Sequence, residues 1–288
     1  MFTGSIVAMV TPFKDGAVDY DKLGELVDYH VENGTNAIIP CGTTGESPTL
    51  SHTEHGEVIG KVIETANGRI PVIGGTGSNN TSEAISLTRH AKEAGADGSL
   101  LITPYYNKPT QQGLYDHYKA ILEEVDIPII IYNVPSRTGV SISPETVARL
   151  SEFDNIVAIK EATGDIDQAS QILTLCDITV LSGDDSLTLP IMSIGGKGVV
   201  SVLANILPRE VSELTASIAK GDIKNSQKLH RSLFPLCKAM FIETNPIPVK
   251  TAMKLLGRLN GEMRLPLSKM SDKHEEQLKE VLNNHGLA

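Results

Sequence analysis

The stretch N-I-V-A-I-K-E-A-T-G-D, residues 155–165, is typical of a buried β-strand that ends in a lysine. Its β-branched residues and the turn residues that bound it favour a strand. Side chains alternate along a strand, so Ala158 and Lys160 share one face. A lysine beside an apolar interior is costly unless it is paired, loses its proton or performs chemistry. Both a fold and a function are needed to explain Lys160.

Short runs of the same kind recur along the chain. Eight are found, at residues 5–10, 37–41, 70–74, 98–103, 127–133, 155–161, 178–183 and 198–202. The centres of the first six are roughly 30 residues apart, which is a usual length for a βα unit, and the segments between them have helical period. Strands that alternate with helices imply a parallel sheet, and eight such units predict an α/β fold, a closed (β/α)8 TIM barrel.

The predicted helices have recognisable ends. Four residues are expected as N-caps: Asp19, Ser51, Ser82 and Ser143. Three glycines are expected just after helix ends: Gly34, Gly68 and Gly95. The alternative fold, an open doubly wound sheet, would usually carry a glycine-rich phosphate loop after an early strand. Residues 11–16, T-P-F-K-D-G, are no such motif, and the glycine cluster at 74–77 matches it only loosely.

Roughly 80 residues follow the eighth run, a length that suits several further helices. Helical patterns are found at 208–220, 223–241, 249–256 and 272–284. No low-complexity linker separates them from the rest of the chain. We therefore expect a barrel over residues 1–225 and a C-terminal helical extension over 226–288, packed together as a single structural unit.

Composition limits the possible partners. The chain has 288 residues, a net charge of −10 and a pI near 5.3. This acidity disfavours non-specific binding to nucleic acid or to an anionic membrane, because both need a basic surface. No apolar run approaches the ~20 residues of a membrane span, and residues 1–5 show no signal-peptide pattern. The irregular spacing of Cys41, Cys176 and Cys237 suggests reduced thiols and a cytoplasmic location.

Polar segments follow five of the predicted strands, at the end where TIM barrels carry their active sites. They are G-T-T-G-E (42–46), T-P-Y-Y-N (103–107), Y-N-V-P-S-R-T-G (132–139), Lys160, and S-G-D-D (182–185). Each alone would also suit a turn or an amphipathic strand end. Their shared placement at one end of the barrel indicates a functional site.

The residue types suggest imine chemistry. A lysine in a dry pocket releases its proton more readily and can form a Schiff base with a ketone. Tyr132, one strand away, could relay protons, and residues 42–45 offer hydroxyls and backbone N–H groups for a carboxylate. We expect a 2-keto acid bound to Lys160, whose enamine attacks an aldehyde without metal or other cofactor. His52 and His55 do not form an H-E-x-x-H motif and predict no metal site.

Four motifs resemble one family. G-T-T-G-E (42–46), Y-N-V-P-S-R-T-G (132–139), I-K-E-A-T-G (159–164) and N-P-I-P-V-K (245–250) are similar to those of dihydrodipicolinate synthases, which are pyruvate-dependent Schiff-base aldolases. The resemblance runs along the whole chain. It implies condensation of pyruvate with L-aspartate 4-semialdehyde to 4-hydroxy-tetrahydrodipicolinate, the first committed step of diaminopimelate and lysine biosynthesis. It also implies a homotetramer, built as a dimer of dimers.

The resemblance assigns roles by motif match. It implies a Schiff base on Lys160 and a proton relay of Tyr132, Thr43 and Tyr106, with Tyr106 coming from a neighbouring subunit. Four residues are implied in substrate binding, together with Thr43: Thr44, Arg137, Gly183 and the backbone near Val200. Seven would bind L-lysine as a feedback inhibitor: Ser47, Pro48, His52, His55, Asn79, Glu83 and Tyr105. Pro48 departs from the pattern, in which alanine is common.

Two alternative functions remain open. Related pyruvate-forming aldolases, N-acetylneuraminate lyase and the 2-keto-3-deoxy-sugar acid aldolases, share the barrel and the imine. They more often carry Gly-Ser-Thr-Gly-Glu in the carboxylate-binding segment and lack the S-R-T-G that supplies Arg137. A ligand-sensing barrel without catalysis is the non-enzyme alternative. The complete set of Lys160, Tyr132 and Thr43 argues against it, since a binding protein needs no nucleophile.

Overall fold

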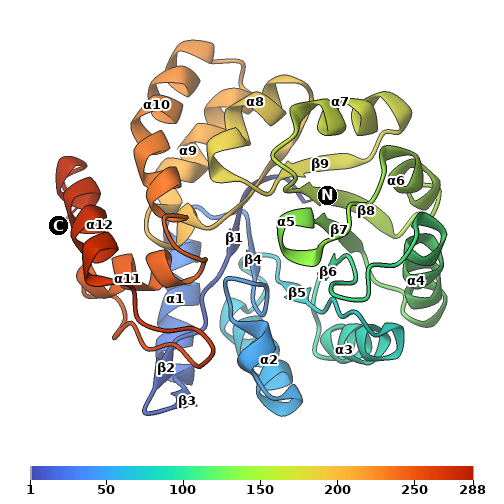
Figure 1. Ribbon diagram of the computed structural model, residues 1–288, viewed down its shortest axis with the longest axis horizontal. Coiled ribbons are helices and arrows are strands. Elements are labelled where there is room, and N and C mark those ends of the chain that lie inside the picture. The colour runs from blue at the N-terminus through green and yellow to red at the C-terminus, as the bar shows by residue number, and fades with distance from the viewer. Residues whose placement is uncertain (1, 288) are drawn as a thin grey trace.

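The structure is a computed structural model, and it describes residues 2–287. Within them, the main sheet has eight parallel strands (Figure 1). They are β1 (Gly4–Ala8), β4 (Ala37–Ile39), β5 (Ile73–Gly75), β6 (Gly98–Ile102), β7 (Ile129–Asn133), β8 (Ile156–Glu161), β9 (Thr179–Ser182) and β10 (Gly198–Ser201). Their order is β4-β1-β10-β9-β8-β7-β6-β5, and a parallel bridge between Ile38 and Val72 joins the two edges. The predicted TIM barrel is confirmed.

Helices surround this barrel. They are α1 (Tyr20–Glu32), α2 (His52–Ala66), α3 (Thr81–Glu93), α4 (Gln111–Glu124), α5 (Pro135–Thr138), α6 (Pro144–Leu150), α7 (Ile166–Leu175), α8 (Thr188–Ser193), α9 (Pro208–Ala219), α10 (Ile223–Ala239), α11 (Ile247–Leu255) and α12 (Asp272–Asn284). Short 3-10 helices are η1 (Ser47–Thr49), η2 (Asp185–Leu187) and η3 (Leu203–Asn205). The sequence analysis did not predict the small antiparallel hairpin of β2 (Phe13–Lys14) and β3 (Ala17–Val18). In residues 2–287, no helix is both long and apolar enough for a membrane span.

Most of the expected helix ends are confirmed. The side chains of three expected N-caps, Asp19, Ser51 and Ser143, accept backbone N–H groups of the first turn. The N-cap expected at Ser82 is wrong: Asn80 is the cap, and it accepts the N–H of Ser82. Residues 79–82, N-N-T-S, are all capable of capping, so composition alone could not choose among them. The three expected glycines, Gly34, Gly68 and Gly95, have φ of +78°, +71° and +96°.

The two faces of the strands form separate apolar clusters. Ile159 packs outward with helix residues such as Ile172. Ala158 packs inward with side chains of neighbouring strands, among them Leu181 and Tyr132. Alternation then places Lys160 on the inner face with Ala158, at the carboxyl end of β8. The predicted orientation of this lysine is confirmed.

The C-terminal helices lie along one flank of the barrel, beside α1 (Figure 1). A single apolar cluster contains Leu23 of α1, Val249 and Met253 of α11, and Leu278 of α12. The division expected at residue 225 falls inside the first turn of α10, which begins at Ile223. The shared core supports one structural unit, and the division itself stays a prediction.

Candidate active site

Lys160 is the second-last residue of β8, and its partner across the ladder is Tyr132 of β7. Its side chain is buried, and its Nζ lies 3.9 Å from the centroid of the Tyr132 ring. The parallel register thus places an amine and a phenol side by side at the carboxyl ends of the barrel strands. Both side chains line the same cavity, so a ligand bound there can contact both of them.

A cavity of about 160 Å³ opens in front of this lysine. Six of the eight residues that the sequence assigned to catalysis and substrate binding line it: Thr43, Thr44, Tyr132, Arg137, Lys160 and Gly183. They come from four separate βα units. The closure of the barrel therefore brings together residues up to 140 positions apart.

The carboxylate loop, residues 42–45, forms one wall of this cavity and follows β4. Thr44 is buried, and its Oγ1 accepts a hydrogen bond from Asn245 Nδ2 at 3.0 Å. Gly45 is needed for close packing, because a Cβ there would lie 2.9 Å from the backbone N of Cys41 and 3.0 Å from the carbonyl O of Met9. The loop is thus held tightly, with two threonine hydroxyls beside the cavity.

Gly183 is also required by close packing. A Cβ at this position would lie 2.5 Å from the Cβ of Ala162 and 3.0 Å from the carbonyl O of Glu161. Its backbone N–H donates to that same carbonyl at 2.7 Å. A larger residue would push β9 away from β8 and shift Lys160.

Arg137 lies on the short helix α5 at the mouth of the cavity. Its side chain is exposed, and Nη2 donates to the carbonyl O of Asn245 at 3.3 Å. A guanidinium at the entrance is well suited to a second carboxylate, because its planar fork binds both oxygens.

Asn245 and Asp184 line the cavity as well, and sequence reasoning gave neither of them a role. Asn245 is buried, and its Oδ1 has no hydrogen-bond partner within residues 2–287. The N-P-I-P-V-K motif was the signal that could have found it. Asp184, next to Gly183, lines the cavity as well. Burial raises the pKa of the Asp184 carboxyl, and the charge of Lys160 opposes that rise.

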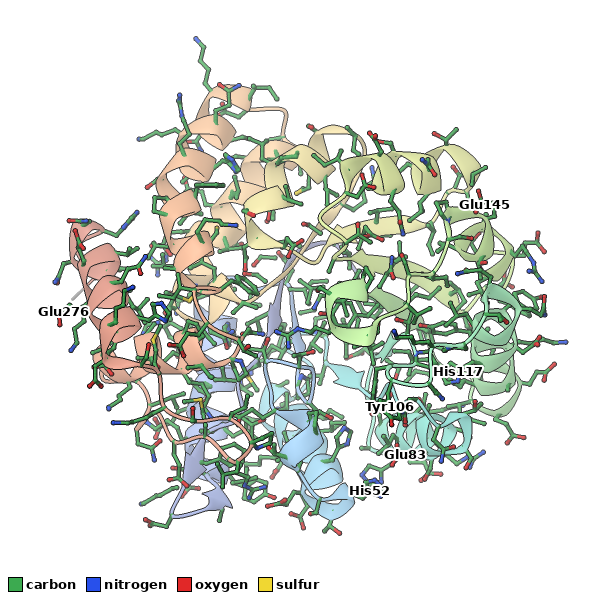
Figure 2. The ribbon with its side chains drawn as sticks, in the orientation of Figure 1. His52, Glu83, Tyr106, His117, Glu145 and Glu276 are labelled. Atoms are coloured by element: carbon green, nitrogen blue, oxygen red, sulfur yellow. The ribbon has the colours of Figure 1, made fainter. Side chains whose placement is uncertain are left out.

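Two predicted residues do not line the cavity. Tyr106 lies on the loop after β6 with its side chain 88% exposed and a φ of +70° (Figure 2). Val200 is fully buried in the barrel interior, paired with Ile6 of β1. The residue from this strand end that does line the cavity is Val202.

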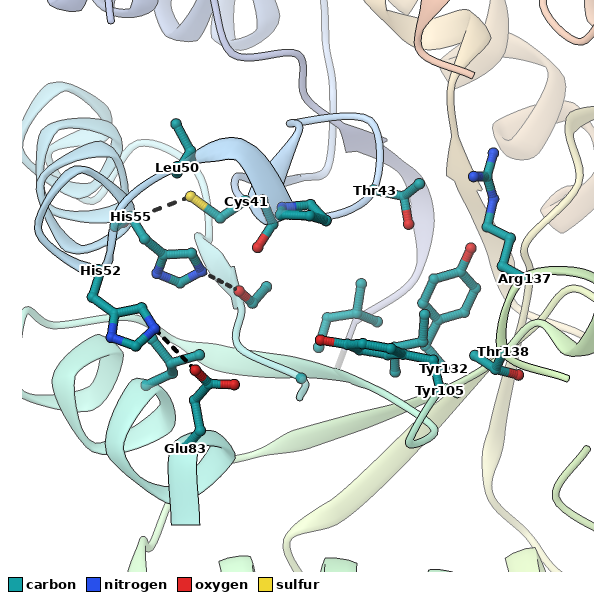
Figure 3. Close-up of a pocket in the computed structure, with 18 residues that line it drawn as sticks. Cys41, Thr43, Leu50, His52, His55, Glu83, Tyr105, Tyr132, Arg137 and Thr138 are labelled. Carbon is teal, nitrogen blue, oxygen red and sulfur yellow. Dashed lines mark hydrogen bonds and ion pairs between the residues drawn. The ribbon is translucent and has the colours of Figure 1, made fainter. Parts of the chain in front are cut away.

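A second, larger cavity of about 450 Å³ adjoins the first (Figure 3). Six of the seven residues assigned to L-lysine line it: Ser47, Pro48, His52, His55, Glu83 and Tyr105. Asn79 does not line it, but its Nδ2 donates to the carbonyl O of Tyr105 at 3.1 Å. Thr43, Tyr132 and Arg137 line both cavities. The two cavities therefore share part of their walls.

Polar side chains of the larger cavity are hydrogen-bonded to protein groups. His52 Nε2 lies 2.9 Å from Glu83 Oε1 (Figure 3). Ser78 Oγ donates to the same carboxylate. His55 is buried and its Nε2 lies 2.9 Å from the carbonyl O of Gly75. Burial lowers the pKa of His55, so this ring is neutral at pH 7. Glu83 is the acidic group available to a cationic ligand.

The chain matches one protein family over nearly its whole length. The sequence pattern of the dihydrodipicolinate synthetase family matches residues 1–285. The chain belongs to this family. The resemblance drawn from the four sequence motifs is confirmed.

Relatives in this family cover the whole chain. The 4-hydroxy-tetrahydrodipicolinate synthase of Geobacter sulfurreducens is 59% identical over 289 residues, covering 100% of both chains. The crystal structure of dihydrodipicolinate synthase from Aquifex aeolicus has a TM-score of 0.98 at 57% identity, with 99% of each chain covered. The name that the relatives share is that of a lyase, and this chain is an enzyme of that class.

Two solved structures in the dihydrodipicolinate synthase family contain ligands. The chloride-inhibited enzyme of Acinetobacter baumannii is complexed with pyruvate, and it matches with a TM-score of 0.98 and 48% identity over 100% of both chains. The enzyme of Cyanidioschyzon merolae has lysine bound, and it matches with a TM-score of 0.97 and 41% identity over 100% of this chain and 99% of that one.

Proposed function

We propose that this enzyme condenses pyruvate with L-aspartate 4-semialdehyde to form 4-hydroxy-tetrahydrodipicolinate, the first committed step of diaminopimelate and lysine biosynthesis. The observation that carries the proposal is the buried amine of Lys160, which faces a small cavity with hydroxyls on one wall and Arg137 at the mouth. The cavity of about 160 Å³ is smaller than the roughly 300–1,000 Å³ of drug-sized ligand sites, and so suits a three-carbon acid.

The reaction follows from these groups. The neutral amine of Lys160 attacks the keto carbon of pyruvate, water leaves, and an imine forms. Loss of a proton from the methyl carbon gives an enamine, which attacks the aldehyde carbon, and the new alkoxide takes up a proton. The amino group of the semialdehyde then displaces Lys160 and closes the ring. Each step needs a proton donor or acceptor, and Tyr132 with Thr43 is placed for that task.

Substrate binding is divided between two ends of the cavity. The hydroxyls of Thr43 and Thr44 hold the pyruvate carboxylate, while Gly183 leaves room beside Lys160. The backbone near Val200 of β10 would assist, since Val202, two residues further on, lines the cavity. Arg137 binds the carboxylate of the semialdehyde at the mouth.

The proton relay is completed by Tyr106 of a neighbouring subunit in a homotetramer, a dimer of dimers. The support is that the large aromatic side chain of Tyr106 is exposed in its own subunit. Sedimentation equilibrium measures the assembly, and a purely monomeric enzyme with full activity would contradict this assignment. The reduced cysteines Cys41, Cys176 and Cys237 support a cytoplasmic enzyme.

The first prediction is the condensation itself. Pyruvate and L-aspartate 4-semialdehyde, coupled to the reductase that follows in the pathway, should consume NADPH. N-acetylneuraminate and 2-keto-3-deoxy-sugar acids should release pyruvate far more slowly, because Arg137 is placed for a short carboxylated aldehyde. Faster cleavage of either sugar acid would make the enzyme a related aldolase instead.

L-lysine is the proposed inhibitor. The larger cavity offers Glu83 for the α-ammonium group, and Asn79 with Tyr105 for the α-carboxylate. Ser47 and His55 line the same cavity and would meet the side-chain end of the ligand, and Pro48 retains the carbonyl that this position would contribute. The lysine-bound structure of a relative supports this use of the fold. Because Thr43 and Tyr132 line both cavities, a ligand in one can change the other.

The second prediction tests this regulation. L-lysine at millimolar concentration should inhibit turnover, whereas D-lysine should not. Glu83→Gln removes the charge that binds the ammonium group, and should raise the half-inhibitory concentration about tenfold or more. Glu93→Gln, on the exposed side of the same helix, is the matched control and should behave as wild type. Unchanged turnover of the wild type, with no heat of L-lysine binding in calorimetry, would contradict the regulatory site.

A further inference from the structure

A buried ion pair joins the C-terminal region to the active site. Lys250 of α11 and Glu46 have side chains that are 1% and 0% exposed, and the Nζ–Oε1 distance is 2.5 Å. Removing two charges from water is costly, and apolar residues of similar size usually serve stability equally well or better. Stability alone is therefore a weak explanation for this pair. Its position beside residues 42–45 suggests a role in the active site.

Glu46 directly follows the carboxylate loop. Its backbone N–H donates to the carbonyl O of Thr43 at 3.1 Å. Both residues that flank residues 42–45, Cys41 and Glu46, have a φ of +55°, in the left-handed region that non-glycine residues rarely adopt. Such conformations persist only where surrounding contacts enforce them. The loop therefore needs an external anchor at each strained end.

Lys250 reaches the loop by two routes. Its Nζ binds Glu46 directly, and it also donates to the carbonyl O of Thr11 at 2.9 Å. The hydroxyl of Thr11 in turn donates to the carbonyl O of Gly45 at 2.6 Å. The ammonium also lies 4.4 Å from the centroid of the Phe13 ring. One cation thus fixes the last residue of the carboxylate loop and the residue after it.

The other side of the pair is supported as well. The backbone N–H of Arg264 lies 3.4 Å from Glu46 Oε2, so the carboxylate has partners on both oxygens. Burial lowers the pKa of Lys250, and the neighbouring Glu46 opposes that change. The contact network is complete without any group of the substrate. The pair therefore acts on the substrate only through the loop.

We propose that Glu46 and Lys250 are positioning residues, which hold the carboxylate loop in the geometry that binds the keto acid. The inference rests on the function proposed above. With the pair intact, the hydroxyls and N–H groups of residues 42–45 are already oriented, and binding loses little conformational freedom. Without it, the strained backbone at Glu46 relaxes and the keto acid must reorder the loop. The affinity for pyruvate should fall, while the chemistry at Lys160 after binding should change little.

The experiment uses a double replacement, because removing one partner leaves the other charge buried and unpaired. Glu46→Leu with Lys250→Met removes both charges at similar volume. Borohydride trapping is measured against pyruvate concentration. The half-saturating concentration should rise about tenfold or more, the scale of one lost charge-assisted contact. The trapping rate at saturation and the KM for the semialdehyde should stay within about threefold of wild type.

A control separates positioning from stability. Ile172→Ala removes a buried side chain of α7 in the outer apolar cluster, away from the loop, and should lower Tm without changing pyruvate half-saturation. Glu46→Gln with Lys250→Gln, which keeps a polar contact, covers the case in which the apolar pair does not fold. It should raise half-saturation by a smaller factor.

The outcomes are distinct. An increase in half-saturation that is confined to the Glu46 and Lys250 variants supports positioning. Half-saturation equal to wild type in those variants, or an equal increase in Ile172→Ala, overturns it while leaving the proposed function intact. If the wild-type enzyme trapped no pyruvate at all, the proposed function itself would be wrong.

Discussion

Replacing Lys160 with alanine should abolish the covalent trapping of pyruvate by borohydride and nearly all turnover. Its amine is the one that lies buried beside Tyr132, and the imine cannot form without it. We expect turnover to fall by at least about 10³-fold, as when a covalent nucleophile is removed. In the wild type, mass spectrometry of the digested protein should place a carboxyethyl group on Lys160.

The matched control is Lys119→Ala, which removes a partly exposed lysine of α4 that pairs with Glu123. It should be labelled and active like the wild type. Labelling at a lysine other than Lys160, or equal labelling of Lys160→Ala, would contradict the imine assignment. The result would also exclude the ligand-sensing alternative if wild-type turnover is measured in the same samples.

Replacing Arg137 with alanine should separate the two substrates. Arg137 lines the cavity, and its guanidinium is the group that we propose binds the semialdehyde carboxylate. Loss of a charge-assisted bond of about 1.5–3 kcal/mol should raise the KM for the semialdehyde roughly 10- to 150-fold. Pyruvate trapping should be nearly unchanged, since Thr43 and Thr44 are the residues proposed to bind the pyruvate carboxylate.

Arg149→Ala provides the comparison for this variant. Arg149 is an exposed arginine of α6 whose guanidinium carbon lies 4.1 Å from the centroid of the Tyr115 ring. It should leave both steady-state constants near wild type. If Arg137→Ala reduced trapping and aldehyde turnover equally, Arg137 would instead support the shape of the cavity.

Local signals predicted the barrel because its strands are short, apolar and evenly spaced. The same signals fixed the inward face of Lys160, since alternation along β8 leaves only two choices. They failed where several residues were chemically equivalent, as at Asn80 and Ser82. The β2–β3 hairpin was missed because each of its strands has only two residues, too few to show a period.

The site was predictable in its reactive residues and less so in their supports. Motifs identified Lys160 and Arg137 because their chemistry is distinctive. Nothing local in the sequence indicates that Asn245 binds Thr44, since the two are 201 positions apart and meet only in the folded barrel. Val200 lies in β10 and Val202 lies just beyond its end. Only the three-dimensional structure shows that Val202 is the one that lines the cavity.

The contacts that hold the carboxylate loop also determine when, during synthesis, this loop can become ordered. Thr44 and Glu46 are translated early, but their partners lie at Asn245 and Lys250. At roughly 5–20 residues per second, the ribosome adds those partners about 10–40 s after Thr44. During that interval the loop has its sequence but not its restraints. An unfinished chain therefore contains Lys160 beside a loop that still lacks these two contacts, and the loop gains them only near the end of synthesis.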